Sequence, residues 1–217
     1  MQRILLSCAA AISLSAGAAD AAQGDWLIRT RALIVAPTEE STGVLPLFPN
    51  SSIGVSNEFT AELDVSYFIL PNLAIETAVG YPTRHSLTGR GDLAFLGEVV
   101  KTDALASIWV LQYHPFPEAK VRPYIGVGAN WTRFVKERES ASLLTAFGPT
   151  TISIDQSYGI VFQAGADIEL TDRFFMNFDA KFMDVDTTGR VKSIGIVNSV
   201  DLALDPFLFG IGFGARF

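Results

Sequence analysis

The end of the chain alternates strictly between bulky apolar side chains and small or charged ones. Glycine and one arginine occupy most of the intervening positions. Because successive side chains of a β-strand point to opposite faces, this pattern predicts a strand with one apolar face. About ten residues suffice to cross a bilayer as a tilted strand. The apolar set, counted back in steps of two, is Phe217, Ala215, Phe213, Ile211, Phe209 and Phe207.

The start of the chain predicts a secretory signal peptide over residues 1–21. Arg3 supplies a positive charge, an apolar run follows from Ile4 to Ala19, and small residues offer a cleavage site after Ala21. The single cysteine, Cys8, lies inside this segment; an alternative use of Cys8 as a lipidation site would leave too short an apolar stretch before it. The mature chain then has no thiol, and the sequence predicts no metal and no cofactor.

Composition separates the chain from most soluble classes. It is 49% apolar and 18% charged, yet beyond the signal segment no stretch reaches the roughly 18 apolar residues of a membrane helix. The net charge of −7 argues against nucleic-acid binding, which requires a positively charged surface. We therefore predict that residues 22–217 form one domain. Its apolar residues are distributed over short segments, as in a transmembrane β-barrel.

Eight segments of the mature chain show the alternation of a half-apolar strand. The connections between them alternate between short ones, at 71–72, 115–122 and 171–173, and long ones, at 37–56, 82–103, 136–157 and 184–198. Short periplasmic turns and long extracellular loops are typical of outer-membrane barrels. The predicted fold is all-β, an eight-stranded antiparallel transmembrane β-barrel. Its strands are expected at 24–36, 57–70, 73–81, 105–114, 123–134, 158–170, 174–182 and 207–217.

The positions predicted to face the barrel interior include many small residues. Eight strands enclose a space only just wide enough to be filled by side chains, so a passage needs small lining residues. The same glycines also suit tight barrel curvature without any transport. The predicted channel lining is Gly80, Ala106, Ile108, Val110, Tyr124, Gly128, Asn130 and Val161.

Charged residues of both signs are also predicted to point inward. Charges within a membrane are costly unless they are paired or hydrated. A mutual network near the periplasmic half would satisfy them and plug the barrel there, whereas a charge-selective aqueous pore is the alternative. The predicted network is Arg29, Arg31, Glu62, Asp64, Glu76, Asp167, Asp179 and Lys181.

Several short motifs support a resemblance to a known family. They are Gly24-Asp25-Trp26, the corner Tyr81-Pro82-Thr83-Arg84-His85, the run 122–132 (RPYIGVGANWT), and Asp205-Pro206-Phe207 before the glycine-rich last strand. In this order they resemble the OmpW family over essentially the whole mature chain. Members often have a Leu-Pro-Pro sequence before the fourth strand, where this chain has Lys101-Thr102-Asp103-Ala104.

The resemblance implies passive uptake of small, mainly hydrophobic molecules across the bacterial outer membrane, with a sideways exit into the bilayer. The alternative is a structural, adhesion or receptor barrel acting through its extracellular loops. Expected partners are the lipid bilayer, lipopolysaccharide, small apolar solutes and the barrel assembly machinery, which would read Phe217 as an assembly signal. We expect a monomer. His85 and Ser86 lack an orienting acid, so no enzyme is predicted.

Overall fold

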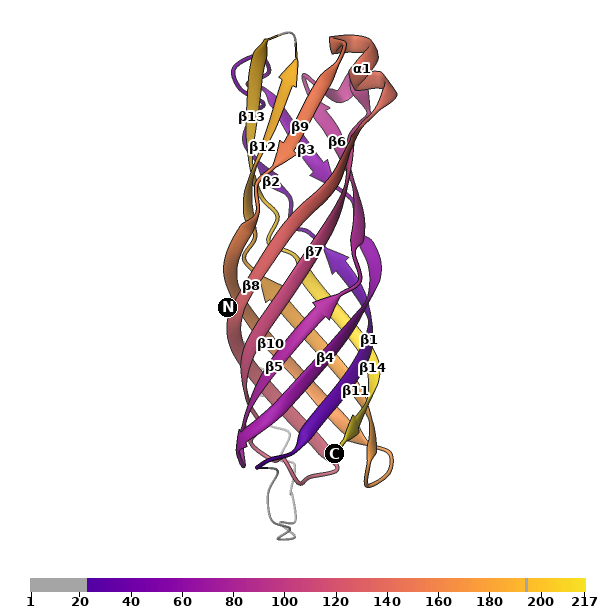
Figure 1. Cartoon of the computed structure of the whole chain (residues 1–217), viewed down its shortest axis with the longest axis vertical. Helices are drawn as coiled ribbons and strands as arrows, with labels where there is room; N and C mark the ends of the chain where they lie inside the picture. The colour runs from indigo at the N-terminus through magenta and orange to yellow at the C-terminus, as the bar shows by residue number, and fades with distance from the viewer. Residues whose placement is uncertain (1–22, 194) are drawn as a thin grey trace, which may run out of the picture.

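The computed structural model describes residues 23–193 and 195–217, so the predicted signal peptide lies outside the described residues. Eight antiparallel strands form a closed barrel that continues at one end into an extension built from further strands and a short helix (Figure 1). In their order around the barrel the strands are β1 (Trp26–Ala36), β4 (Glu58–Leu70), β5 (Leu73–Gly80), β7 (Glu98–Tyr113), β8 (Val121–Glu139), β10 (Ser157–Glu169), β11 (Phe174–Met183) and β14 (Phe207–Arg216).

The first and last strands of the chain close the barrel. Ile28 of β1 lies opposite Val65 of β4 on one side and Ala215 of β14 on the other. Every neighbouring pair is antiparallel, and the closed ladder leaves no sheet edge in the membrane. The eight-stranded barrel predicted from the alternation is confirmed.

The four long connections contain ordered structure, whereas the sequence predicts irregular loops. β6 pairs with β3 and with the outer part of β7, and a second sheet has the strand order β2-β13-β12-β9. The added elements are β2 (Glu40–Ser41), β3 (Ser51–Val55), β6 (Thr83–Gly91), the 3₁₀ turn η1 (Ala94–Leu96), α1 (Ala141–Phe147), β9 (Thr150–Ile154), β12 (Asp186–Ser193) and β13 (Ile196–Ala203).

Burial of an apolar inner face explains why these connections fold. Val44, Ile53, Leu87, Val100 and Leu202 belong to one cluster of buried residues contributed by all four of them. Each such side chain stabilises the fold by roughly 1.5–3 kcal/mol when it leaves water. The barrel strands β7 and β8 also run beyond their predicted ends because they frame this extension.

The outer surface of the barrel carries the apolar belt of a membrane protein. Ile125 and Phe209 are more than half exposed on it, and Tyr81 and Tyr158 stand at its outer end. Charged side chains begin beyond this girdle of aromatic side chains. The membrane-spanning part of the barrel therefore ends at the girdle, and β6 lies outside the membrane-spanning part. None of the helices in the described part of the chain is long and apolar enough to span a bilayer.

Candidate functional site

The periplasmic half of the barrel interior is filled by ion pairs centred on Arg29. Its guanidinium donates to both carboxylate oxygens of Asp167, at 3.1 and 2.9 Å, and to Asp64 at 3.0 Å. It also lies 5.5 Å from the ring centroids of Tyr124 and Phe175. Arg29 has no exposed surface, so its charge is compensated entirely by protein groups.

A second layer of ion pairs lies beside the first. Arg31 reaches Glu62 at 2.6 Å and Glu76 at 3.2 Å, and Lys181 reaches Glu62 at 2.7 Å and Asp179 at 2.8 Å. All eight residues of the predicted charge network are buried within the barrel and joined by these contacts. The sequence placed them on inward positions of five strands that are distant in the chain.

Neutral donors complete this network, because five carboxylates face only three bases among its eight charged residues. Gln112 and Gln163 donate to Glu76 at 2.8 and 3.0 Å, and Asn177 donates to Asp167 at 2.7 Å. The Tyr124 hydroxyl donates to Asp179 at 2.7 Å, so Tyr124 belongs to this layer and lies outside the cavity above it. Together these side chains occupy the barrel cross-section.

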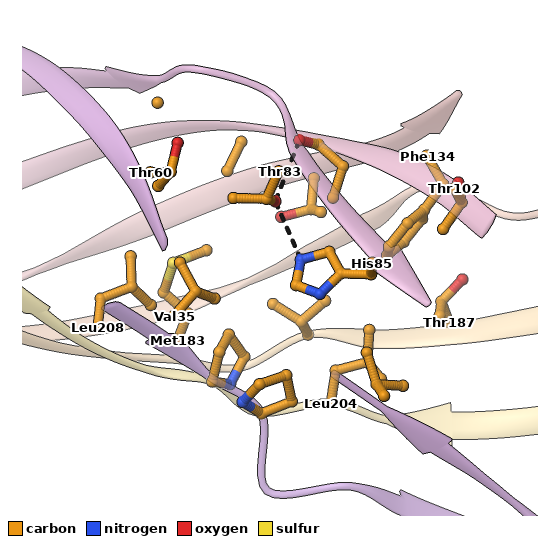
Figure 2. A pocket seen from close by; sticks show the side chains of 18 of the residues that line it. Val35, Thr60, Thr83, His85, Thr102, Phe134, Met183, Thr187, Leu204 and Leu208 are labelled. Carbon is orange, nitrogen blue, oxygen red and sulfur yellow. Dashed lines mark hydrogen bonds between the residues drawn. The ribbon is translucent and has the colours of Figure 1, made fainter. Parts of the chain in front are cut away.

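Above the network the interior opens into an apolar cavity of about 90 Å³. Figure 2 shows part of its wall. Of the predicted lining residues, Gly80, Ala106 and Ile108 face this cavity. Most of the other residues in the cavity wall were not predicted to line a channel. They lie in segments that were expected to be loops, or at the ends of strands. The apolar side chains among these residues include Val35, Phe134, Met183, Val185, Leu204 and Leu208.

The other predicted lining residues lie elsewhere in the barrel. Val110 and Val161 are buried in the apolar layer beneath the cavity. Asn130 donates to the carbonyl oxygen of Asp184 at 3.0 Å. At Gly128 a Cβ atom would come within 1.9 Å of the Trp109 carbonyl oxygen, so this glycine permits close approach of β7 and β8.

Threonines in the cavity wall turn their hydroxyl groups toward the backbone. Thr60 donates to the Tyr81 carbonyl at 2.8 Å, Thr187 to that of Asp155 at 2.6 Å, and Thr102 to that of Val135 at 3.3 Å. A hydroxyl that is already bonded does not require a polar partner from a solute. The wall is therefore apolar in its chemistry although several residues are formally polar.

His85 is the titratable side chain of β6 that faces this cavity (Figure 2). Its Nδ1 lies 3.1 Å from the Ser56 carbonyl oxygen, and its Nε2 lies 2.9 Å from the Thr83 hydroxyl. Burial lowers the pKa of His85 below its usual 6.5, opposed by the Ser56 carbonyl and the Glu58 carboxylate. Ser86, the next residue, points to the other face of the strand, so these two residues form no nucleophile and base pair.

The lowered pKa of His85 predicts a pH dependence of stability. The unfolded chain takes up a proton near pH 6.5, whereas the folded protein keeps the ring neutral to a lower pH. Stability contributed by this residue is therefore lost as the pH falls below about 6.5. Replacing His85 with glutamine should flatten the decline of the unfolding midpoint between pH 7.5 and 5, whereas K192Q should not. The same decline in H85Q and the parent would contradict this account.

A second apolar cavity, of about 150 Å³, lies under the extracellular sheets. Leu87, Ile154 and Leu202 line both cavities, so the two adjoin at these side chains. The outer cavity is walled mainly by the buried cluster that holds the extension together. Apolar side chains therefore line the interior from the extracellular extension down to the charge network.

The barrel wall beside the inner cavity has a break in its backbone ladder between β4 and β6. Tyr81 donates to the Ala61 carbonyl at 2.7 Å, and Ser56 donates to that of Ser86 at 3.2 Å. Between these two bonds, residues 57–60 and 82–85 exchange no backbone hydrogen bond in the described structure. Pro82 has no N–H to offer. The Thr60 hydroxyl donates to the Tyr81 carbonyl at the inner end of the break, and the His85 ring contacts the Ser56 carbonyl at its other end.

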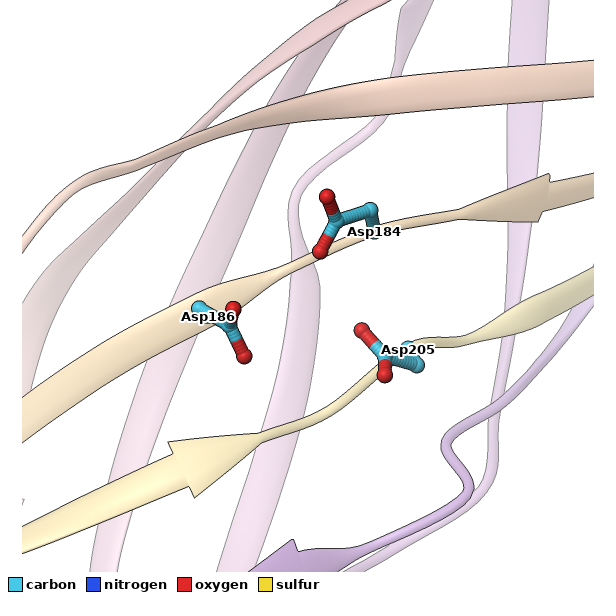
Figure 3. Close-up of side chains that lie close together, drawn as sticks. All are labelled: Asp184, Asp186 and Asp205. Carbon is cyan, nitrogen blue, oxygen red and sulfur yellow. The ribbon is translucent and has the colours of Figure 1, made fainter.

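Three aspartates gather where β11 leads into β12 and β13 leads into β14. Carboxylate oxygens of Asp184, Asp186 and Asp205 all lie within 4.8 Å of one another (Figure 3). Burial and the charges of its two neighbours raise the pKa of Asp186. Oxygen ligands of this kind suit a hard cation. Exposed acidic groups are common without one, and we assign no metal here.

The terminal Phe217 lies at the periplasmic end of the barrel. Its backbone N–H and carbonyl exchange hydrogen bonds with Trp26, and the Arg173 guanidinium stands 4.3 Å from its ring centroid. The ring is 54% exposed, so it remains accessible at the membrane boundary.

Comparison with known proteins decides the family. The model of the OmpW family matches residues 22–217. The chain belongs to the OmpW family. The outer membrane protein W of Vibrio cholerae is 29% identical over 198 residues, covering 90% of this chain and 89% of the relative.

Two further matches extend the comparison. The dibenzothiophene metabolism operon protein PahQ of Pseudomonas aeruginosa is 26% identical, covering 78% of this chain and 76% of PahQ. The crystal structure of OprG from Pseudomonas aeruginosa superimposes with a TM-score of 0.85 at 23% identity and covers 91% and 97% of the two chains, which shows the same fold. This OmpW-family member is thus a β-barrel of the outer membrane.

Proposed function

We propose that this protein is an outer-membrane channel for the passive uptake of small, mainly hydrophobic molecules. The single observation that carries the proposal is the apolar cavity above the buried charge network, inside a barrel that a membrane surrounds. An apolar solute gains free energy on leaving water for such a cavity. A polar solute would lose hydrogen bonds there, because the wall hydroxyls are already bonded.

Lateral release at the outer boundary of the bilayer, the level at which β6 begins, completes the proposed route. The charge network fills the periplasmic half, so an apolar solute in the cavity meets a desolvated ionic layer below it. The break between β4 and β6 lies at the side of the same cavity. Leaving there requires the displacement of side chains and no rupture of backbone ladder bonds.

The similarity to PahQ adds chemical context. That relative is named for a dibenzothiophene metabolism operon. Dibenzothiophene is an apolar molecule, and this is the class of solute that the cavity wall suits.

Closing the break with a disulfide tests the route. In the variant A61C/Y81C the two new thiols lie on the outer face at the inner end of the break, since the Tyr81 N–H donates to the Ala61 carbonyl oxygen at 2.7 Å and both side chains are exposed. We expect its oxidised form to lose most uptake of a small apolar solute into cells or vesicles, and its reduced form to regain it. Uptake of a small polar solute should remain at background throughout.

The matched control is L63C/V79C, which joins two directly paired positions of β4 and β5 where the ladder is intact. Oxidation of this control should leave uptake unchanged. Full uptake by oxidised A61C/Y81C would contradict lateral release at this place. Equal uptake with and without the parent protein would contradict the channel and favour a role of the extracellular extension in adhesion or as a receptor.

Oligomeric state, assembly and processing of the protein are also proposed from its barrel fold. We propose that the barrel acts as a monomer, because its closed ladder leaves no edge strand for a partner. We propose that Phe217 is read by the barrel assembly machinery and that residues 1–21 are removed as a signal peptide. We assign no catalytic role, because the family and fold are those of outer-membrane barrels.

A further inference from the structure

A cluster of basic side chains lies on one side of the barrel, directly beyond the girdle of aromatic side chains that ends the lipid-facing belt. Arg84 of β6, Arg133 of β8 and Lys136 of β8 are exposed there, on adjacent strands of the β6-β7-β8 face. Arg133 lies opposite Leu105, an outward apolar residue of β7. The bases therefore begin where the belt ends, although the chain as a whole carries a net charge of −7.

Asp103 of β7 holds two of these bases in place. One carboxylate oxygen accepts from Arg84 at 3.1 Å and the other contacts Lys136 at 3.1 Å. The Asp103 side chain is only 8% exposed, whereas those of Arg84 and Lys136 are 59% and 62% exposed. These two hydrogen bonds lower the pKa of Asp103, which keeps it ionised. Two of the three bases thus pair with one carboxylate, which leaves these four side chains with a net positive charge.

The backbone is distorted to build this arrangement. The pairing of β7 with β8 shifts register between Lys101 and Asp103, and Lys136 has a φ of 57°. A left-handed backbone conformation is unfavourable for a lysine. A bulge re-aims a side chain, and here Lys136 is aimed at Asp103 beside Arg84.

An open hollow adjoins the cluster. Arg133, Lys136 and Glu137 of β8 line one side of it, and Ile154, Asp155 and Gln156 line the other. Trp131, whose indole N–H donates to Gln156 at 3.2 Å, stands two residues before Arg133 on β8. The hollow therefore lies at the depth where the headgroups of the outer leaflet begin.

From this geometry we infer that the β6-β7-β8 face binds the phosphate groups of an outer-leaflet glycolipid, with Arg133 and Lys136 on the rim of the hollow and Arg84 beside them. Guanidinium and ammonium groups are the ordinary phosphate ligands of proteins. The height of the cluster above the belt favours a lipid anchored in the membrane over a soluble anion. The inference goes beyond the channel proposal and does not depend on solute transport.

Binding of lipid A to the purified full barrel tests the inference. The measurement is the dissociation constant in detergent, with a chelator present so that divalent cations do not bridge, for diphosphorylated lipid A and for the same lipid without phosphates. We expect R133Q/K136Q to bind diphosphorylated lipid A about tenfold more weakly than the parent. R90Q/K192Q removes two exposed extracellular bases outside this cluster and should bind as the parent does.

Asp103 is a positioning residue in this account. D103N should weaken lipid binding while β content and the response to salt of the remaining binding persist. Equal affinity of the parent and R133Q/K136Q, or equal affinity for lipid A with and without phosphates, would overturn the inference. Binding of inorganic pyrophosphate as tight as that of lipid A would overturn the assignment to a lipid and identify a soluble anion instead.

Discussion

Replacing Arg29 with alanine should lower the free energy of unfolding of the barrel by about 3–5 kcal/mol, because it leaves Asp64 and Asp167 buried without their base. The loss also removes the guanidinium from between the Tyr124 and Phe175 rings. The measurement is equilibrium unfolding of protein refolded in detergent, followed by the shift between folded and unfolded bands. Ionic conductance in planar bilayers should rise, since water enters the space that the side chain leaves.

The control for this prediction is R90A, which removes an exposed arginine paired with Glu39. An exposed ion pair contributes only about 0–1 kcal/mol, so the stability of R90A should stay close to that of the parent. If R29A instead kept both the parent's unfolding energy and its conductance, the inward charges would be hydrated and the periplasmic half would be open.

The sequence predicts the spanning part of this barrel well because lipid imposes a strict rule on it. Outward side chains such as Ile125 and Phe209 must be apolar, while inward ones such as Arg29 and Glu62 need polar partners, so the alternation is sharp. The alternation also identifies which side chains face inward. The alternation does not give the position of these side chains along the barrel axis, because that position depends on strand tilt and on the register between strands. Val110 was therefore predicted to line a channel that begins above it.

The extension escaped prediction because water contacts one of its faces and the constraint there is weaker. In β6 a regular alternation is nevertheless present, with His85 and Leu87 buried and Arg84 and Arg90 exposed. Turn residues such as Gly89 and Gly91 obscured it. The cavity wall above the network consists largely of such segments, which is why Thr102 and Thr187 were not predicted to line it.

Filling the inner cavity with one indole should abolish uptake of apolar solutes. Gly80 lines this cavity, and a Cβ atom added there would meet only the Ala61 carbonyl oxygen, at 3.9 Å, so the first side-chain atom of G80W causes no clash with the backbone. An eight-stranded barrel is about as wide as the side chains that fill it, so one tryptophan should close the path. We expect at least a tenfold loss of uptake in G80W, and the same in A106W, whose site faces the cavity from β7.

The neighbouring residue supplies the matched control. Val79 lies next to Gly80 on β5 but faces the lipid with 51% of its surface exposed, so V79W adds the same side chain to the other face of one strand at nearly the same depth. V79W should transport as the parent does. If folded G80W and A106W both transported normally, apolar solutes would not cross this cavity, because no other space at this level of the narrow barrel could carry them past an indole. The extracellular extension would then be the part of the molecule in which to seek its function.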